Sequence, residues 1–330
     1  MMKVSDGREL PLLDDKVNNW QPAGTEHNWQ DSVVLVWWDA ENKVGGFHRI
    51  GHEPNYKDGP KIALWNHLCS PDGNYRKNEY MDLRDADRLD NGGFGAGDTC
   101  RYEFLEGQHV WTIADGDVSA RLSHSDFHAS VECYPKDSTV SEEFANVHAD
   151  IPGLVTGDLS IGGKSYQVKG LSFRDRGWGR REWESLLAHR WVAGTFGEEF
   201  SFLALSWYSS EEDIASFGWV VRGDTVTYAK RVDILTHVEV DGMVNRGGSV
   251  RFELTTGEVF DIECHRAAEK AFISTHHGVC CVDTLCEISC GDMRGFCDFE
   301  STANIQCGKR MPTTFVNGVC HDGYQAIEKP

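Results

Sequence analysis

The sequence predicts an all-β protein with two domains. Glycine is frequent and proline is sparse, with 34 and 9 residues in a chain of 330. Short apolar runs of strand length follow one another with turn residues between them, and few windows repeat apolar residues at helical spacing. A chain of this length is long enough for two domains and a large buried core.

The first half predicts two hairpins and a meander. Residues 32–39 (SVVLVWWD) form a buried strand, and residues 44–50 return as its partner after a turn. Residues 159–168 predict two strands around Gly162-Gly163, a two-residue hairpin loop. The meander strands are expected at residues 101–104, 110–114 and 118–122. Helix is expected only at residues 81–89 and for a turn or two after Pro135.

The second half continues with strands separated by Gly or Asp. They are expected at residues 200–207, 214–222, 225–228, 234–240, 249–254 and 259–265. The polar stretch between Pro135 and Gly153 is the weakest join in the chain. We therefore expect a domain boundary near residue 150, with domains at 1–150 and 151–330.

Charge and cysteine content narrow the class of protein. The chain has 32 Lys and Arg against 52 Asp and Glu, a net charge of −20, which argues against nucleic acid or an anionic membrane as a partner. No apolar run is long enough to predict membrane insertion. The first twenty residues lack an apolar signal core, and the eleven cysteines lack a small-scaffold disulfide pattern. A cytoplasmic protein with free thiols is expected, as a monomer or homodimer.

Signals for cofactors and metals have simpler explanations. The glycine-rich residues 92–97 lead into a predicted strand, whereas a dinucleotide-binding loop must open a helix, so a flexible loop is expected. Seven cysteines follow residue 279 without a Cys-x₂-Cys pair, and buried core thiols are expected rather than a metal site. We expect no cofactor and no metal.

Tryptophans and arginines mark the most unusual segment. The chain has eleven tryptophans, and aromatic side chains usually serve the core. Several of them lie beside charged residues, which also favours an aromatic-walled pocket. The densest group is residues 170–183 followed by 189–191, which contain five arginines: Arg174, Arg176, Arg180, Arg181 and Arg190.

Asp175 is the carboxylate at the centre of this segment. In one interpretation it is an ion-pair partner of Arg174, Arg176 or Arg181 that braces a domain junction. In the other, an apolar aromatic cavity raises its proton affinity and makes it a general acid, while the arginines oppose that shift. The residues alone leave both interpretations open.

The same region carries a family resemblance. Residues 148–183 (HADIPGLVTGDLSIGGKSYQVKGLSFRDRGWGRREW) and 189–197 (HRWVAGTFG) resemble the carotenoid 1,2-hydratase (hydroxyneurosporene synthase) and AttH-like superfamily, and more closely its bacterial branches. Trp37-Trp38 and residues 46–54 look like the matching N-terminal strands, and residues 295–300 resemble the closing strand. The resemblance covers most of the chain, and its central motif is the specific part.

The resemblance implies two lipocalin-like, calycin-type β-domains with a lipophilic cavity at or near their junction. Members of the superfamily hydrate isoprenoid double bonds or a flavonoid, or direct Diels–Alder cyclisations, and none needs a cofactor. Protonation of an alkene makes a carbocation, which tryptophan faces stabilise. The positions that match the family motif are His148, Arg174, Asp175, Trp178 and Arg181.

We therefore expect a cofactor-independent lyase or isomerase that acts on a lipophilic isoprenoid, terpenoid or polycyclic substrate by hydration, dehydration, double-bond isomerisation or cyclisation. Asp175 and His148 are the expected acid–base pair, with Arg176 in the catalytic set. Arg174, Arg176 and Arg181 are expected to set the charge of Asp175. The expected substrate-binding residues are Arg174, Trp178, Arg181, Trp191, Trp38, Trp65 and His48. The alternatives are a pericyclic cyclase of the same fold and a non-catalytic binding protein for a lipophilic ligand.

Overall fold

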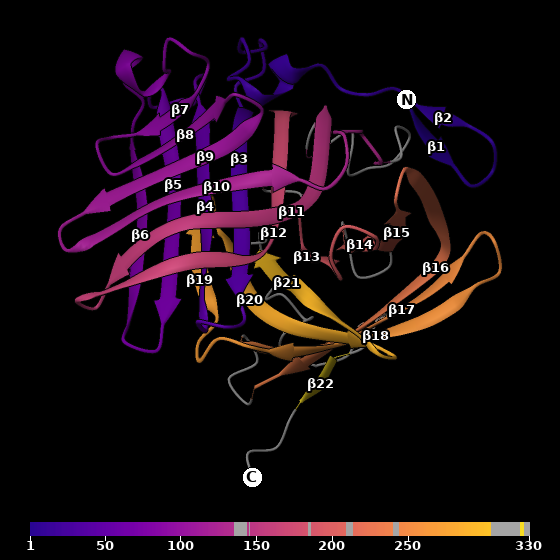
Figure 1. Cartoon of the computed structure of the whole chain (residues 1–330). Coiled ribbons are helices and arrows are strands. Elements are labelled where there is room, and N and C mark those ends of the chain that lie inside the picture. Colours follow the sequence, from indigo (N-terminus) through magenta and orange to yellow (C-terminus); the bar gives the residue numbers. More distant parts are fainter. Residues whose placement is uncertain are drawn as a thin grey trace. The chain divides into compact units, whose positions relative to one another are not determined.

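The computed structural model describes residues 1–134, 144, 146–183, 186–208, 214–239, 244–304 and 324–326. Strands make up 68% of the described residues and helices 2%, which confirms the all-β prediction. The chain divides into two compact units (Figure 1). The N-terminal unit is Pro11–Arg181, and the C-terminal unit combines Met1–Leu10 with Glu182–Pro330.

The N-terminal unit is a curled antiparallel sheet. Among the described residues it has ten strands in the order β6-β5-β4-β3-β12-β11-β10-β9-β8-β7. Strands that follow one another along the chain pair, except β6 and β7, which lie at the two ends of this order. Pairing of β12 with β3 joins the two halves of the sheet. The strands are β3 (Trp29–Asp39), β4 (Val44–Glu53), β5 (Lys61–Ser70), β6 (Gly73–Asp82), β7 (Phe94–Ala96), β8 (Cys100–Leu105), β9 (Gln108–Asp115), β10 (Val118–Asp126), β11 (Val147–Ile161) and β12 (Lys164–Arg180).

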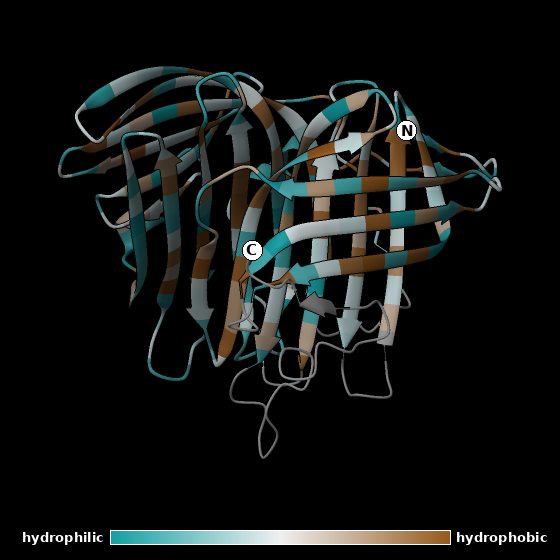
Figure 2. Ribbon diagram, turned by 90° about the horizontal axis from the view of Figure 1, so that it is seen from below, coloured by the Kyte–Doolittle hydropathy of each residue, from teal (hydrophilic) through white to brown (hydrophobic). Residues whose placement is uncertain are grey.

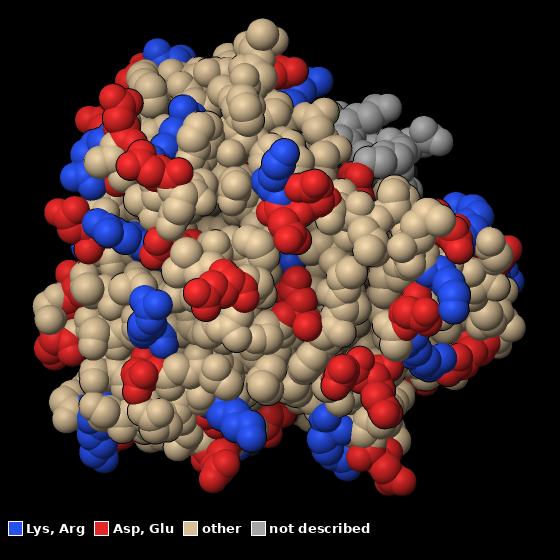
Figure 3. Space-filling model, turned by 45° about the horizontal axis from the view of Figure 1, so that its top comes forward, with Lys and Arg blue, Asp and Glu red and all other residues tan. Residues whose placement is uncertain are grey.

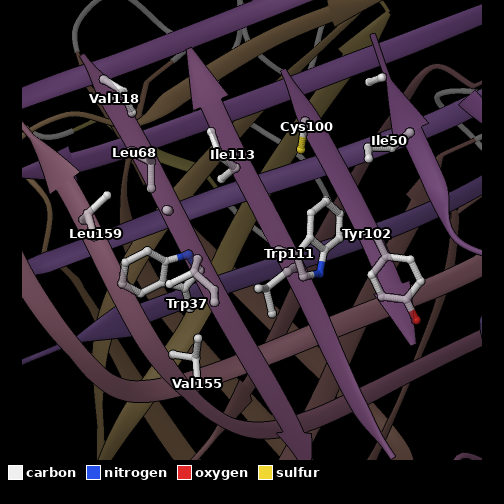
Figure 4. Close-up of a cluster of buried hydrophobic side chains, with 14 of the residues drawn as sticks. Trp37, Ile50, Leu68, Cys100, Tyr102, Trp111, Ile113, Val118, Val155 and Leu159 are labelled. Carbon is white, nitrogen blue, oxygen red and sulfur yellow. The ribbon is translucent and has the colours of Figure 1, made fainter. Parts of the chain in front are cut away.

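Alternate residues of these strands build the core of the N-terminal unit. Successive side chains of a strand point to opposite faces of the sheet, and hydrophobic and hydrophilic residues alternate along many strands in Figure 2. Leu35, Trp37, Ile50 and Trp111 belong to one buried hydrophobic cluster, part of which is shown in Figure 4. Val34 lies between two core positions of β3 and therefore faces the other way.

The C-terminal unit is a closed barrel with additional strands. Its sheet runs β15-β14-β13-β21-β20-β18-β17-β16, and β15 also pairs with β16, so these eight strands close. Their bounds are β13 (Ala188–Thr195), β14 (Ser201–Tyr208), β15 (Ile214–Arg222), β16 (Thr225–Val238), β17 (Asn245–Leu254), β18 (Val259–Arg266), β20 (Val279–Cys290) and β21 (Met293–Asn304). The additional strands are β1 (Met2–Val4), β2 (Glu9–Leu10), β19 (Phe272–His276) and β22 (Tyr324–Ala326). Because β1 pairs in parallel with β16, the first ten residues belong to this unit.

Most of the predicted strands are present. The turn at Gly162 and Gly163 has φ values of 63° and 76°, as a two-residue hairpin requires. Separate strands were expected at residues 225–228 and 234–240, but one strand, β16, runs from Thr225 to Val238. Its pairing with β17 shifts register at two places. Residue 240 lies outside the described residues. The boundary expected near residue 150 falls inside β11, whereas the N-terminal unit ends at Arg181.

Two local predictions were wrong. The helix expected at residues 81–89 is replaced by the end of β6, where Met81 pairs with Ile62, and by a short 3-10 turn, η2 (Asp85–Asp87). The long-range partner strand extends β6 and overrides helical propensity there. The glycine-rich loop expected at residues 92–97 contains strand β7, whose Phe94 is buried in the core. The turn expected after Pro135 lies outside the described residues.

The expected burial is confirmed for four of the five late cysteines that the structure describes, and the fifth, Cys290, is half-buried. Cys280, Cys281, Cys286 and Cys297 are buried free thiols. Cys307 and Cys320 lie outside the described residues. The smaller elements of the N-terminal unit include a second 3-10 turn, η1 (Asp15–Asn18).

Acidic and basic side chains are interspersed over the face shown in Figure 3. This arrangement fits a surface whose excess acidic charge is spread out, with no large positive area on that face. Within the described part of the chain, no helix has the length and apolar character needed to cross a membrane.

Candidate functional site

The candidate site is built on four neighbouring strands of the N-terminal unit. The turn between β11 and β12 places Asp150 directly opposite Asp175. Pairing of β12 with β3 then places Asp175 opposite Val34, and the β3–β4 hairpin places Val34 opposite Arg49. Directly opposed residues share a face of a sheet. Asp150, Asp175 and Arg49 therefore lie in one row on the same face.

His148, Asp150 and Asp175 form a close group that we call the acid–histidine cluster. Nε2 of His148 lies 2.7 Å from Oδ1 of Asp175 and 3.9 Å from Oδ1 of Asp150. The His148 ring stacks on Tyr134 with a centroid distance of 4.3 Å. The Asp150 side chain is fully buried, whereas the Asp175 side chain is 19% exposed. Solvent therefore reaches the cluster at Asp175.

His148 and Asp175 make an ion pair. Burial alone would raise the pKa of Asp175, but the charge and hydrogen bond of His148, with the charges of Arg181 and Arg49, outweigh it, and the pKa is lowered. Burial alone would lower the pKa of His148, but the charges of Asp175 and Asp150 and the hydrogen bond to Asp175 raise it. An imidazolium that donates to a carboxylate is the resulting state.

Asp150 has the opposite tendency. Burial raises its pKa to about 7, the nearby charge of Asp175 adds to the rise, and His148, Tyr134 and Arg174 offset part of it. Two carboxyl groups on opposite positions of one hairpin thus differ in proton affinity, which is the usual basis of an acid and base assignment.

The raised pKa of Asp150 predicts how stability changes with pH. The ordinary value is 3.8 and the folded value is about 7, so the stabilisation from the protonated form is complete below the ordinary pKa and is lost as pH rises through 7. In Asp150→Asn, the amide keeps the shape of the carboxyl group but does not titrate. We expect the free energy of unfolding of the variant, relative to that of the original chain, to rise by on the order of a few kcal/mol as pH increases from 4 to 8. Urea unfolding at each pH measures this, and a pH-independent difference would contradict the assignment.

Arg181 and Arg49 are the cationic side of the site. Burial and then the charge of Arg49 lower the pKa of Arg181 to about 10, against the opposing effect of Asp175. Both arginines are buried, and Nη2 of Arg181 lies 3.4 Å from Oγ of Ser32. The charge of Arg181 contributes to the lowered pKa of Asp175.

Arg174 and Arg176 lie on the opposite face of β12, which corrects the expectation that they set the charge of Asp175. Arg174 donates from Nε to Oδ1 of Asp126 at 2.7 Å. Arg176 lies 2.5 Å from Asp31. The reason is strand alternation, since residues 174 and 176 both flank 175 and point away from it. The catalytic role expected for Arg176 therefore has no geometric support in this arrangement.

Two other predicted residues share that opposite face. Trp178 lies under Arg176, with the guanidinium carbon 4.7 Å from its ring centroid. His48 accepts a hydrogen bond from Nε1 of Trp37 at 3.0 Å and bonds Asn66 at 2.7 Å, and burial lowers its pKa to about 4. Neither side chain is directed at the acid–histidine cluster.

The other predicted tryptophans divide between the units. Trp38 and Trp65 lie on the face of Asp175, because Trp38 pairs opposite Leu171 and Trp65 opposite Arg49. The guanidinium carbon of Arg49 lies 4.4 Å from the Trp65 ring centroid. Trp191 belongs to β13 of the C-terminal unit.

Sequence reasoning missed Asp150, Arg49 and Tyr134. Asp150 had a usable signal: it lies two residues after His148, and extending the hairpin predicted around Gly162-Gly163 places it opposite Asp175. Arg49 lay within the residues that matched the family's N-terminal strands, but its proximity to Asp175 depends on the pairing of β3 with β12. Tyr134 lies outside any predicted strand and had no comparable signal.

The acid–histidine cluster also has the composition of a metal site. One imidazole nitrogen and two carboxylate oxygens lie within 4.8 Å of one another, a ligand set that suits a divalent cation. The charges of Arg181 and Arg49 act on the same carboxylate, Asp175. These two positive charges would repel a metal ion bound at the cluster, so proton chemistry fits these residues better than metal binding.

Comparison with solved structures shows the fold. An AttH-type protein of Nitrosomonas europaea, provisionally named, has a TM-score of 0.66 at 11% identity, over 92% of this chain and 99% of that one. Kievitone hydratase from Nectria haematococca has a TM-score of 0.63 and 10% sequence identity, and the match covers 92% of this chain and 96% of that one. CghA has a TM-score of 0.58 and 10% sequence identity, with 91% of this chain and 97% of that one covered. These matches confirm the predicted lipocalin-like fold class, and the structures matched include an AttH-type protein. The carotenoid hydratase assignment itself stays a prediction.

Comparisons of the amino-acid sequence identify a family but no curated relative. A search of curated proteins found no significant match. One family model, described as a domain of unknown function (DUF7064), matches residues 14–305, which is most of the chain. The matched range contains every residue of the acid–histidine cluster and both arginines beside it. The chain therefore belongs to the DUF7064 family.

Proposed function

We propose that this chain is a cofactor-independent lyase or isomerase that protonates a double bond of a lipophilic substrate, with Asp150 as the acid. The observation that carries the proposal is the difference between the two opposed carboxyl groups of the hairpin. Asp150 is buried with a pKa of about 7, so much of it holds a proton near neutral pH. Asp175 beside it is held ionised by His148. An acid and a base therefore lie within one cluster.

The proposed reaction uses both groups. The O–H bond of Asp150 breaks as its proton passes to one carbon of the double bond, whose π electrons form the new C–H bond and leave a cation at the other carbon. Water then adds to that cation, or a neighbouring C–H bond is lost to re-form a double bond. Asp175 accepts the released proton. His148, which lies near both carboxylates, returns it to Asp150.

This proposal revises the role of Asp175. The sequence favoured Asp175 as the acid, yet its lowered pKa suits a base or an orienting anion. Trp38 and Trp65 lie on the same face of the sheet as Asp175. Aromatic rings near a cation stabilise it, and the Trp65 ring already does so for Arg49. Kievitone hydratase, whose structure has a similar fold, is named for hydration, which supports hydration as the first reaction to test.

The deciding experiment is mass spectrometry of small molecules after incubation with a lipophilic extract of the producing cells. The original chain should yield a compound changed by one water, or an isomer with a shifted double bond or a new ring. Asp150→Asn should retain the precursor. Asp158→Asn is the matched control, because Asp158 is an exposed carboxylate on the same strand.

The outcomes separate the candidate functions. Product from the original chain and from Asp158→Asn, but not from Asp150→Asn, supports the acid assignment. Product formed equally by all three overturns it and favours a pericyclic cyclase that only folds its substrate. If every protein returns the same unchanged ligand, the chain is a binding protein and the catalytic proposal fails.

A further inference from the structure

We propose that this chain forms a symmetric dimer in which the outer edge of β6 (Gly73–Asp82) pairs in antiparallel fashion with β6 of a second copy. The inference concerns an interaction surface of the N-terminal unit and does not depend on the proposed function. It rests on the regularity and exposure of this strand and on the order of its charges.

β6 is a long and regular edge strand. It lies at one end of the sheet of the N-terminal unit (Figure 1), and within the described part of the chain no strand pairs with its outer edge. On its other side it pairs with β5 along all 10 of its residues without a register shift. Many proteins blunt such an edge with a proline, a β-bulge or a very short strand, and β6 has none of these. Its main-chain edge is therefore a template for a further strand.

β6 is also exposed. Eight residues of β5 are buried, whereas no residue of β6 is. Arg76, Glu79 and Tyr80 are among its exposed residues. The Tyr80 side chain donates a hydrogen bond to Oε2 of Glu53, and Tyr80 is nevertheless 45% exposed, which is unusual for a large aromatic residue. A second chain can therefore approach β6 without any change in the core.

The charges of β6 cancel within the strand. Arg76 and Lys77 precede Glu79 and Asp82, so the strand is neutral although the whole chain has a net charge of −20. Charges protect a sheet edge when they repel a second copy of it. β6 is positive in its first half and negative in its second half, so two antiparallel copies bring opposite charges together.

Strand geometry then selects one register. In an antiparallel ladder, two directly opposed residues both direct their main-chain groups toward each other or both direct them away. Two copies of the same edge must therefore be centred on a residue. Centring on Asn78 aligns residues 74–82 with residues 82–74 of the second copy and places Lys77 opposite Glu79. Centring on Lys77 or on Glu79 instead places that residue opposite its own copy, and directly opposed like charges are destabilising.

This register gives each face of the ladder a favourable pair of neighbours. Arg76 lies opposite the exposed Tyr80 of the second copy, at a Cβ separation of roughly 5 Å that suits a cation–π contact. Lys77 lies opposite Glu79 of the second copy. It also keeps the contacts within its own chain, to Asp115 at 3.1 Å and to Glu79 at 3.5 Å, because an ammonium group has three donors. The two-fold axis repeats each contact.

The test reverses the two opposed charges and measures dimerisation by sedimentation velocity over a range of concentrations. The original chain should dimerise. Glu79→Lys places two lysines opposite each other, and Lys77→Glu places two glutamates opposite each other. Each variant alone should therefore raise the dimer Kd at least about tenfold. An equimolar mixture of the two variants restores both pairs of opposite charge and should dimerise like the original chain.

Glu41→Lys is the matched control, because it reverses an exposed carboxylate in the turn between β3 and β4, and it should leave the Kd unchanged. Circular dichroism confirms that each variant is folded. Hydrogen exchange of the original chain needs no variant: the amides of β6 should exchange more slowly above the Kd than below it.

Recovery of dimers in the mixture supports both the surface and its register, because residues 77 and 79 of different copies must then meet. An original chain that is monomeric at every concentration overturns the proposal. A Glu79→Lys variant that dimerises as tightly as the original chain also overturns it, as does exchange of the β6 amides that is independent of concentration. A folded mixture that stays monomeric overturns the register and with it the proposed pairing.

Discussion

Replacing Asp150 by Asn should lower the turnover of the substrate identified from the extract by about 10²–10⁴-fold. The amide has the shape of the carboxyl group but has no acidic proton to give. Asp150 is fully buried and its pKa is raised to about 7, so the protein has already formed an environment in which the proton is retained. Single-turnover kinetics with the purified substrate measure the chemical step directly.

The pH profile of the original chain provides the second half of this test. Turnover should be high below pH 7 and fall as pH rises through 7, because the ionised carboxylate cannot donate a proton. Asp175→Asn should behave differently. It removes the anion that raises the pKa of His148, so it should alter the return of the proton and shift the profile. A flat profile in the original chain, with full activity in Asp150→Asn, would rule out Asp150 as the acid.

Replacing Arg176 by Met should destabilise the N-terminal unit by about 3–5 kcal/mol. Arg176 lies 2.5 Å from the buried Asp31 and donates hydrogen bonds to the main-chain oxygens of Val17 and Asn19. Its side chain is 1% exposed. Met removes the charge and the donors together, so a buried carboxylate and several carbonyls lose their partner.

Urea unfolding of the whole chain measures this loss. Arg121→Gln is the matched control, because Arg121 is an exposed arginine of the same unit, and it should change stability by less than about 0.5 kcal/mol. The double variant Arg176→Met with Asp31→Asn should recover part of the loss, since the uncompensated charge is gone. A single variant as stable as the control would return Arg176 to the list of catalytic candidates.

Local sequence was sufficient for the half of the site that lies on one hairpin. A two-residue glycine turn sets the register of β11 and β12 without further information. Residues equally distant from that turn therefore face each other, which brings Asp150 to Asp175 and His148 to Gly177. Alternation along β12 likewise separates Asp175 from Arg174 and Arg176. From the sequence, however, this hairpin was predicted only over residues 159–168 and was not extended to residues 148–150, so Asp150 was missed.

The other half of the site depends on contacts between distant parts of the chain. Arg49 reaches the cluster because β3 pairs with β12, and no local signal predicts which strand closes a sheet. The same kind of pairing, β1 with β16, assigns the first ten residues to the C-terminal unit. The acid assignment also needed the fold, because Asp150 and Asp175 are chemically identical. The deeper burial of Asp150, the closer approach of His148 to Asp175 and the charges of Arg181 and Arg49 separate their pKa values.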